Sequence, residues 1–577
     1  MGLTLDAAME SVEELFATRY QEGLTPGLVY GVVRDGELVH SAGLGTTHAA
    51  GSRVPDADSV FRIASMSKSF TAAALLLLRD RGLVDLDEAV AQYVPELVDQ
   101  PPHSPHSPAV TLRLLLSMSA GLLTDDPWGD RQEALPYADF GTFLDGGFTV
   151  GCEPGTAFEY SNLGYALLGR VIENVVGGAE PEGANRRFIE SELLAPLGMT
   201  STRFDATEVG SALVPGHVLR STGWQELAPT APGAFSAMGG LHSSLTDLAR
   251  WVGGFLSAFR PGRDASPLSK ASRREMQQMH RFNTVTGTLS ARGADAGIGA
   301  VALGYGYGLM VEHDAALGHF VHHSGGYPGY GSRMVWHPAT GLGVVTMSNG
   351  TYAGAYEQAL TATRLLVRAA GRPASAPSLP ATRDAVAYAT DRVASFDPVT
   401  TGEPFADPQR FADNVELDVP DEERRGALQQ ARKVAGEPQP VADPAPLWSR
   451  AMAHAGWSVP AERGRYDLEL LLSPEETPRL QQLLVRPVAD VPAEVLDRAH
   501  AALAADTPET RIMTAFGTPE LLPRAVASDG TGTAELLVAA GPTWWKVVLT
   551  PEAVTLEAHP TSAYPRLAAL AEVLRAA

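Results

Sequence analysis

SVFRIASMSKSFTAAALLLLRDRG occupies residues 59–82 of this 577-residue chain and decides how the rest of it is interpreted. Ser65 stands ahead of an alanine and leucine run, and Gly82 follows as an expected C-cap, so residues 65–82 are predicted to form a buried helix. Lys68 comes three residues after Ser65, a spacing that places both side chains on one face of the helix. The stretch therefore predicts a helix that begins with a serine beside an amine.

A serine beside a lysine can act as a nucleophile. Its hydroxyl is weakly nucleophilic until a neighbouring base takes the proton, and a lysine partly desolvated by the surrounding core can do so. The start of a helix also favours the negative charge that develops there. The pattern Ser-x-x-Lys alone also occurs at ordinary helix starts with a solvated lysine, so other residues have to decide between the two interpretations.

A second group of polar residues is Tyr160-Ser161-Asn162, in a loop ahead of the helical run LGYALLGRVIENVV (163–176). Outside an active site, the same residues would form a serine or asparagine helix cap next to a core tyrosine. Both interpretations place the group directly at a helix start.

A third group, His323-Ser324-Gly325-Gly326, ends an apolar strand ahead of the turn YPGYGS. The alternative interpretation is a plain strand that ends in a glycine-rich turn. In that interpretation His322 is a surface residue.

The order and spacing of the three groups resemble those of the serine beta-lactamase and penicillin-binding protein superfamily, above all its branch of class C beta-lactamases, esterases and D-aminopeptidases. The resemblance covers roughly residues 5 to 370 and includes the flanking stretches TLRLLLSMSAGLL (111–123) and EPGTAFEYSNLGYALLG (153–169). The combination is far more specific than any one motif.

The resemblance implies a role for each matching residue. Ser65 would be the acylated nucleophile, Lys68 the base for acylation and Tyr160 a second proton carrier. The backbone N–H groups of Ser65 and Gly326 would form the oxyanion hole. The remaining positions would bind substrate, and they are Asn162, His323, Ser324 and Gly325. Asn162 would orient the substrate amide and the lysine.

The third group departs from the superfamily pattern at its first position. That position is often Lys, whereas here it is His323, as in some D-aminopeptidases and related peptidases. Imidazole is mostly neutral near its usual pKa of about 6.5, so it can hold a substrate carboxylate or stabilise the Tyr160 phenolate only in part. We therefore expect weak or no penicillin hydrolysis.

Periodicity over the first two thirds of the chain predicts an α+β architecture. A helix is expected at 5–22, a hairpin turn at Asp35-Gly36, mostly helical structure from about 111 to 290, and a second hairpin turn at 338–341. A helix at about 353–370 closes the sheet. With the resemblance, residues 1–372 are expected to form a beta-lactamase/transpeptidase-like fold, in which helices flank an antiparallel sheet and a helical subdomain is inserted.

The last third of the chain is expected to form a separate, smaller module. Residues 373–385 are rich in Pro, Ala and Ser and are predicted to be a linker. Residues 386–577 predict an α+β domain of unknown role, with strands in RYDLELLL (465–472), TAELLVAA (533–540) and WWKVVLTPEAVTLEAH (544–559) and a final helix at 564–577.

The composition of the chain limits which binding partners, cellular location and cofactors are expected. The net charge of -23 would repel nucleic acid and anionic membrane surfaces, so neither is expected as a partner. The apolar run Ala72–Leu78 is far shorter than the roughly 20 residues that span a bilayer. The acidic start MGLTLDAAMESVEELF has no secretory pattern, so a cytoplasmic location is expected. The lone Cys152 predicts neither a disulfide nor a metal site, and no cofactor is implied.

These features predict a serine hydrolase that cleaves amide or ester bonds of a small-molecule or peptide substrate through an acyl-serine. D-aminoacyl peptides or amides and small acyl esters are the expected substrates. Two alternatives stay open, namely an acyltransferase or peptide cyclase that uses the same acyl-serine, and a ligand-binding or sensing protein without turnover. Self-association into a homo-oligomer also stays open.

Overall fold

The computed structural model of the protein describes residues 5–559, apart from 52, 263–265, 291–296, 315–316, 371–378, 397–406, 445, 450, 517, 531 and 541–542. The chain divides into two compact units. One comprises residues 1–286 with 301–371, and the other comprises residues 372–577 with 287–300.

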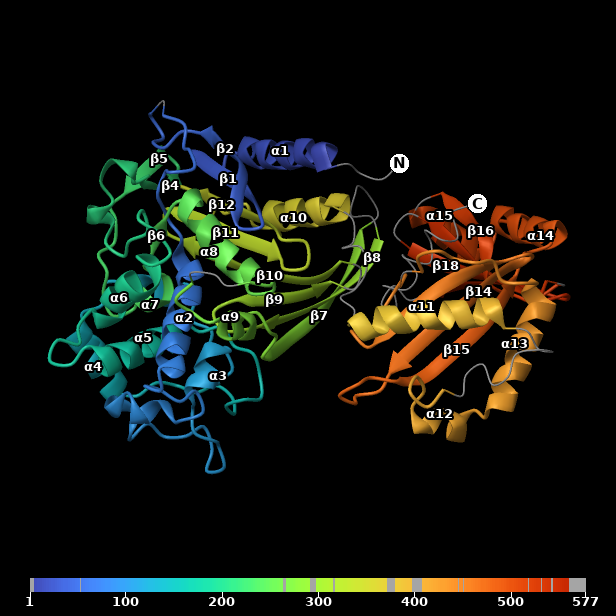
Figure 1. Cartoon of the computed structure of the whole chain (residues 1–577). Coiled ribbons are helices and arrows are strands. Elements are labelled where there is room, and N and C mark those ends of the chain that lie inside the picture. The colour runs from blue at the N-terminus through green and yellow to red at the C-terminus, as the bar shows by residue number, and fades with distance from the viewer. Residues whose placement is uncertain are drawn as a thin grey trace. The chain divides into compact units, whose positions relative to one another are not determined.

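The first unit is built on an eight-stranded sheet with the order β2-β1-β12-β11-β10-β9-β8-β7 (Figure 1). The pairings described from β2 to β8 are all antiparallel. Asp35 and Gly36 have φ values of 51° and 93°, as a tight hairpin turn requires, which confirms the first predicted hairpin. The strands are β1 Gly27–Arg34, β2 Glu37–Gly45, β7 Arg281–Ser290, β8 Gly297–Tyr305, β9 Met310–Asp314, β10 Gly318–Tyr327, β11 Tyr330–His337 and β12 Leu342–Ser348.

The two faces of this sheet are covered differently. Helices α1 (Leu5–Gln21) and α10 (Tyr356–Ala370) pack against each other and cover one face (Figure 1). Successive residues of a strand point to opposite faces, so Phe320 of β10 joins the α1 and α10 core while its neighbour Val321 joins the core of the helical region. The same alternation sends His322 and His323 to opposite faces.

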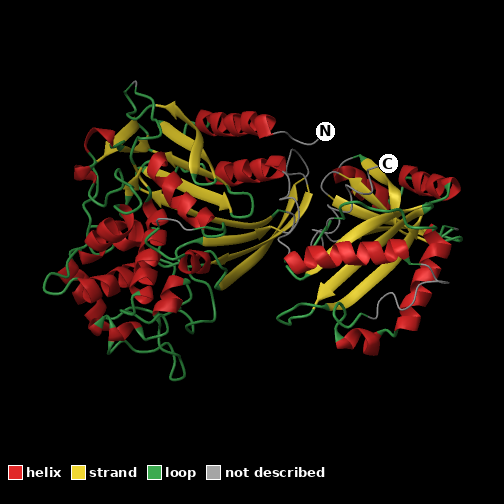
Figure 2. Ribbon diagram, viewed as in Figure 1, coloured by secondary structure: helices red, strands yellow, loops and turns green. Residues whose placement is uncertain are grey.

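A helical region covers the other face, and Figure 2 shows its helices in red beside the yellow strands. Its α-helices are α2 Ser67–Asp80, α3 Leu112–Leu116, α4 Tyr137–Asp145, α5 Asn162–Val176, α6 Ala184–Ile189, α7 Ser236–Gly239, α8 Leu245–Ser257 and α9 Lys270–Met276. Short turns of helix connect them, namely η1 Ala64–Met66, η2 Val90–Gln92, η3 Pro95–Leu97, η4 Gly129–Gln132, η5 Glu190–Leu194, η6 Ala206–Glu208 and η7 Gly210–Ala212.

The range 111–290, expected to be mostly helical, contains strands in three places. The strands β4 (Gly216–Arg220) and β5 (Gly223–Leu227) form a hairpin around Gly223, which has a φ of 106°. The last ten residues of the range form β7. The paired strands β3 (Phe61–Arg62) and β6 (His242–Ser243) are also too short to show a period in the sequence.

The second unit contains two further antiparallel sheets, of three and four strands, which confirms a C-terminal region rich in sheet. Two separate hydrophobic cores support them, one around Trp457 and Tyr466 and the other around Trp545 and Met513. The predicted helix at 564–577 lies outside the described residues. The elements are α11 Pro380–Ser395, α12 Asp413–Asp418, α13 Asp421–Ala435, β13 His454–Ala461, β14 Gly464–Leu472, β15 Leu480–Ala489, α14 Ala493–Ala504, α15 Pro508–Phe516, β16 Pro519–Ser528, β17 Ala534–Ala540, β18 Thr543–Leu549 and β19 Val554–His559.

The predicted linker, residues 373–385, is corrected in its second half. Helix α11 begins at Pro380, because proline suits the first position of a helix and the preceding Leu379 has the extended conformation of an N-cap. Val386 and Ala389 then continue the helix with buried side chains. Residues 373–378 lie outside the described residues.

Candidate active site

Ser65 lies in the turn η1, immediately before α2, and is 9% exposed. The residue before it, Ala64, has a φ of 46°, a left-handed conformation that is strained for a non-glycine residue. Such strain persists where the surroundings enforce it, and it concentrates at functional sites. The predicted helix at 65–82 is thus confirmed from Ser67 onward, with Ser65 in the turn that leads into it.

Lys68 is fully buried, and its Nζ atom has three oxygen neighbours. They are Ser65 Oγ at 2.9 Å, Asn162 Oδ1 at 2.7 Å and the backbone carbonyl of Met238 at 2.8 Å. A neutral amine carries two N–H bonds and one lone pair. Because the two carbonyl oxygens can only accept, they take both N–H bonds, and the lone pair faces the Ser65 hydroxyl.

The orientation of the Asn162 amide is set by Asp126. Asn162 Nδ2 donates to Asp126 Oδ1, which turns Oδ1 of the amide towards Lys68. The neighbouring Asp125 accepts from the backbone N–H groups of Asn162 and Leu163, each at 2.7 Å, and so stabilises the start of α5. Ser161 is the N-cap of that helix, as the capping interpretation predicted.

The pKa of Lys68 is lowered from 10.5 to about 8 because burial penalises the charged ammonium. Four carboxylates oppose this effect, and they are Asp126, Asp125, Asp130 and Glu133. All four come from the 125–133 segment, which the motifs did not single out. The sequence signal that could have found it is the acidic pair Asp125-Asp126 shortly after the stretch SMSAGLL.

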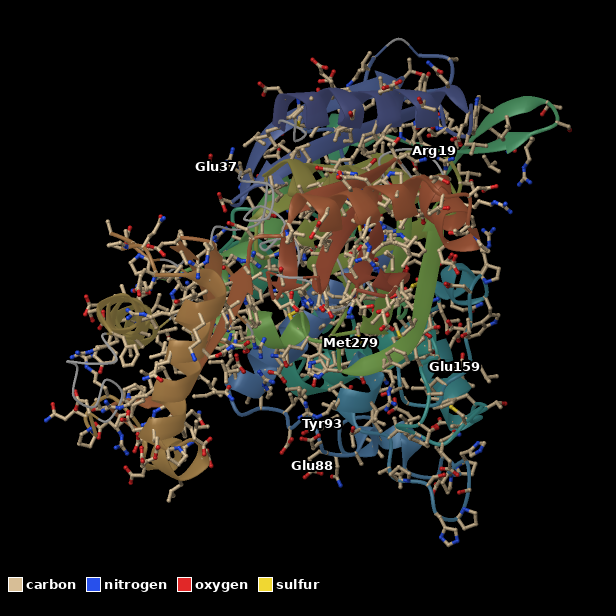
Figure 3. All side chains as sticks on the ribbon, turned by 90° about the vertical axis from the view of Figure 1, so that its right-hand side faces the viewer. Arg19, Glu37, Glu88, Tyr93, Glu159 and Met279 are labelled. Atoms are coloured by element: carbon tan, nitrogen blue, oxygen red, sulfur yellow. The ribbon has the colours of Figure 1, made fainter. Side chains whose placement is uncertain are left out.

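Tyr160 lies against the amine, with Lys68 Nζ 4.9 Å from the centre of its ring. Burial raises the pKa of Tyr160 well above its usual value of 10, an effect that the neighbouring Ser65 hydroxyl opposes only in part. The phenol is therefore neutral at ordinary pH and able to donate its proton. The loop before Tyr160 is tied to the acidic segment, since Thr124 donates to Glu159, which is labelled in Figure 3, at 2.6 Å.

His323 lies beneath this group on β10 and is 1% exposed. Its Nδ1 atom is 2.6 Å from the Ser324 carbonyl and so carries the hydrogen, while its Nε2 atom is 3.0 Å from the Tyr305 hydroxyl and accepts from it. Burial and the nearby Lys68 lower the pKa of His323 to about 3, so the ring is neutral. With both nitrogens engaged, the geometry favours a role in holding Tyr305 over direct contact with a substrate carboxylate.

The surroundings of His322 differ from those that the motifs alone indicate. His322 is 8% exposed, not a surface residue, because the alternation of β10 turns it inward towards Arg333 and Glu312.

Tyr305 belongs to the stretch GYGYG, whose Gly308 would place a Cβ 2.5 Å from the Lys68 carbonyl. A side chain at that position would push the β8–β9 connection away from α2.

Gly325 brings β10 next to the nucleophile. A Cβ at this position would lie 2.0 Å from the Ile63 carbonyl, so only glycine allows the approach. Ser332 of the neighbouring strand donates to the same carbonyl at 2.8 Å. The chain from Ile63 to Ser65 is thereby fixed alongside Gly325 and Gly326, where the oxyanion hole is expected.

The comparisons with known proteins fit this arrangement. Residues 12–369 match the family model described as Beta-lactamase. The chain belongs to the beta-lactamase family. Within the family, it is 25% identical to protein flp of Staphylococcus aureus (strain NCTC 8325 / PS 47) over 360 residues, which cover 60% of this chain and 64% of that protein. It therefore spans less than two thirds of the length of protein flp. It is also 25% identical to penicillin-binding protein 4* of Bacillus subtilis (strain 168), over 64% of this chain and 78% of that protein.

Among solved structures, the octameric penicillin-binding protein homologue from Pyrococcus abyssi has a TM-score of 0.52 at 18% identity, over 96% of this chain and 98% of that chain. A class C beta-lactamase has a TM-score of 0.48 at 17% identity, over 62% of this chain and 95% of that chain. The predicted family and the beta-lactamase/transpeptidase fold are thereby confirmed. Among the described residues, no helix has the length and apolar character needed to cross a bilayer.

Proposed function

We propose that the protein is a serine hydrolase of amide or ester bonds in which Ser65 is acylated. The observation that carries the proposal is the environment of Lys68 Nζ, which lies 2.9 Å from Ser65 Oγ and 2.7 and 2.8 Å from two carbonyl oxygens. In the neutral amine the two carbonyl oxygens take both N–H bonds, so the lone pair is left for the Ser65 hydroxyl. A lysine held in this way, with a pKa near neutrality, is a general base that is ready to take the serine proton.

The reaction follows from these positions. Lys68 takes the Ser65 proton as Oγ attacks the carbonyl carbon, and the N–H groups of Ser65 and Gly326 stabilise the oxyanion. The neutral Tyr160 phenol donates its proton to the leaving group as that bond breaks, and the ammonium of Lys68 returns a proton to Tyr160. Water then attacks the acyl-serine as Lys68 takes its proton, and Lys68 passes that proton to Ser65 Oγ as the acyl C–O bond breaks, which releases the acid and restores Ser65. D-aminoacyl amides and small acyl esters are the proposed substrates.

Intact mass spectrometry tests this proposal. The protein is mixed with activated acyl esters, D- and L-aminoacyl anilides and a penicillin, and masses are recorded over time. We expect an adduct of acyl mass that appears and then disappears. The compound that forms and loses its adduct fastest identifies the class of substrate. Faster clearing on addition of an alcohol or amine would assign acyl transfer. Absence of both adduct and product with every compound would favour a binding protein.

The pH dependence of kcat/KM is expected to follow the protonation state of the Lys68 amine. The amine acts as a base only when it is neutral, so activity should rise about tenfold per pH unit below its pKa and level off above about pH 8. Tyr160 stays protonated throughout, and His323, with a pKa of about 3, adds no inflection near 6.5. A profile of ester hydrolysis from pH 5 to 10 measures this. An inflection near 6.5 would instead indicate a histidine base.

Penicillins are expected to be poor substrates because of their carboxylate. The charges around Lys68 are the carboxylates of the 125–133 segment, and His323 is neutral. A like charge several ångströms away costs about 1 to 2 kcal/mol at an intermediate dielectric, or about tenfold in rate. The methyl ester of a penicillin, which lacks that charge, should therefore show kcat/KM about tenfold above the free acid. Faster hydrolysis of the free acid would contradict this.

A further inference from the structure

Tyr352 lies in the turn between β12 and α10 and has an unusual backbone. Its φ is 52°, a left-handed conformation that is costly for a bulky residue, and its side chain is 42% exposed. The backbone is held there by hydrogen bonds from Tyr352 N to the carbonyls of Tyr327 and Tyr330, at 3.4 and 3.2 Å. The surroundings therefore enforce a strained conformation for an exposed aromatic ring.

The ring of Tyr352 packs directly on Gly326. A Cβ at Gly326 would lie 2.7 Å from Tyr352 Cδ1, so the ring occupies the space that a side chain would take. Gly326 is the proposed second donor of the oxyanion hole. Tyr352 is thereby placed at the end of β10 where the carbonyl of a substrate would be held.

The hydroxyl of Tyr352 reaches the opposite side of the site. It donates to Asp130 Oδ2 at 2.7 Å, and Asp130 is only 4% exposed. The adjacent Gly129 packs on Asn162, since a Cβ at Gly129 would lie 2.7 Å from Asn162 Cβ. The hydrogen bond therefore joins the Gly326 side of the site to the Asn162 side.

The two tyrosines of the site lie at different positions along β10. The Tyr160 ring is 6.3 Å from the ring of His323, whereas Tyr352 packs on Gly326. Gly326 lies three residues after His323 along the strand, a span of about 10 Å. Because Tyr160 donates the proton to the leaving group, the leaving group lies at the His323 end. The substituent of the acyl group then extends towards the Gly326 end.

We propose that Tyr352 and its hydrogen bond to Asp130 form the wall that limits the length of the acyl group. This inference rests on the proposed function, because it places the acyl group relative to Ser65 and Tyr160. It assigns to the site a preference for acyl groups of a few atoms. Tyr352 acts here as a specificity-determining residue, while the acylation chemistry depends on the residues around Lys68.

The test compares p-nitrophenyl acetate, butyrate and octanoate with the wild type, Tyr352→Gly and Tyr352→Phe. Glycine suits the positive φ, so Tyr352→Gly removes the ring without adding backbone strain. The wild type should prefer acetate over octanoate by about tenfold or more in kcat/KM, and Tyr352→Gly should raise the octanoate to acetate ratio about tenfold. Tyr352→Phe keeps the ring and loses the hydrogen bond, so its ratio should lie between the two.

The outcomes separate the inference from the proposed function. If wild type and Tyr352→Gly both hydrolyse the esters in a Ser65-dependent manner with the same chain-length ratio, the inference is overturned and the proposed function stands. If no variant shows hydrolysis or acylation above the Ser65→Ala level, the proposed function fails and the inference fails with it. Melting temperatures of each variant, and labelling of Ser65 by a small fluorophosphonate, show that the site is folded.

Discussion

Replacing Ser65 with alanine is expected to abolish acyl-enzyme formation and to lower kcat by on the order of 10⁴- to 10⁶-fold. The reason is that the proposed base, Lys68 Nζ, lies 2.9 Å from Ser65 Oγ, and alanine leaves it no hydroxyl to deprotonate. The loss of one small hydroxyl at a 9% exposed position leaves the packing of α2 unchanged. Intact mass spectra and initial rates with an activated ester measure both effects.

Ser67→Ala is the matched control for this variant. Ser67 lies two residues further along and is buried, and its hydroxyl accepts from the Leu241 backbone N–H at 3.0 Å. Its removal leaves a buried donor unsatisfied and should cost about 1 to 3 kcal/mol of stability, while the acyl adduct still forms. An adduct that persists in Ser65→Ala, or vanishes equally in both variants, would contradict the assignment of Ser65 as nucleophile.

Replacing Lys68 with methionine is expected to lower kcat by about 10²- to 10⁴-fold, the usual contribution of a general base. Methionine is unbranched and of similar length, so it fills the buried space without supplying a basic amine. The rise of activity through about pH 8 should disappear together with the rate, because that rise reports the neutral amine. Rates of ester hydrolysis across pH 6 to 10 measure both changes.

Lys68→Arg distinguishes a role of Lys68 as general base from a role as a positive charge. A guanidinium stays charged at all working pH values and cannot take the serine proton. If Lys68 acts as the base, the arginine variant should be as slow as the methionine variant. Recovery of activity in Lys68→Arg, with a flat pH profile, would show that the site needs the charge alone.

Several parts of the molecule could be predicted from the sequence because they depend on local patterns. Helix α1, the hairpin at Asp35-Gly36 and the helix after Ser65 follow from periodicity and turn residues that are close in the chain. The hairpin β4–β5 and the helical start at Pro380 were missed, since short alternating segments and proline-rich stretches carry little period. Packing against neighbouring elements decides their structure.

The candidate site was only partly visible in the sequence. Motifs pointed to Ser65, Lys68, Tyr160 and Asn162, and the structure brings all four together. They did not point to Asp126, which orients the Asn162 amide, because the acidic pair Asp125-Asp126 belongs to none of the three motifs and only folding brings it to Asn162. The motifs also missed three residues that act through contacts between segments distant in sequence, namely Tyr305, Asp130 and Tyr352.

The sequence by itself determined which residues could react, since a serine and a lysine three residues apart at a helix start meet through local geometry alone. Only the tertiary structure decided in which protonation state they stand. The pKa of Lys68 at about 8, the raised pKa of Tyr160 and the lowered pKa of His323 all result mainly from burial. Desolvation and Coulomb effects depend on groups that folding brings together from far along the chain, so no motif records them.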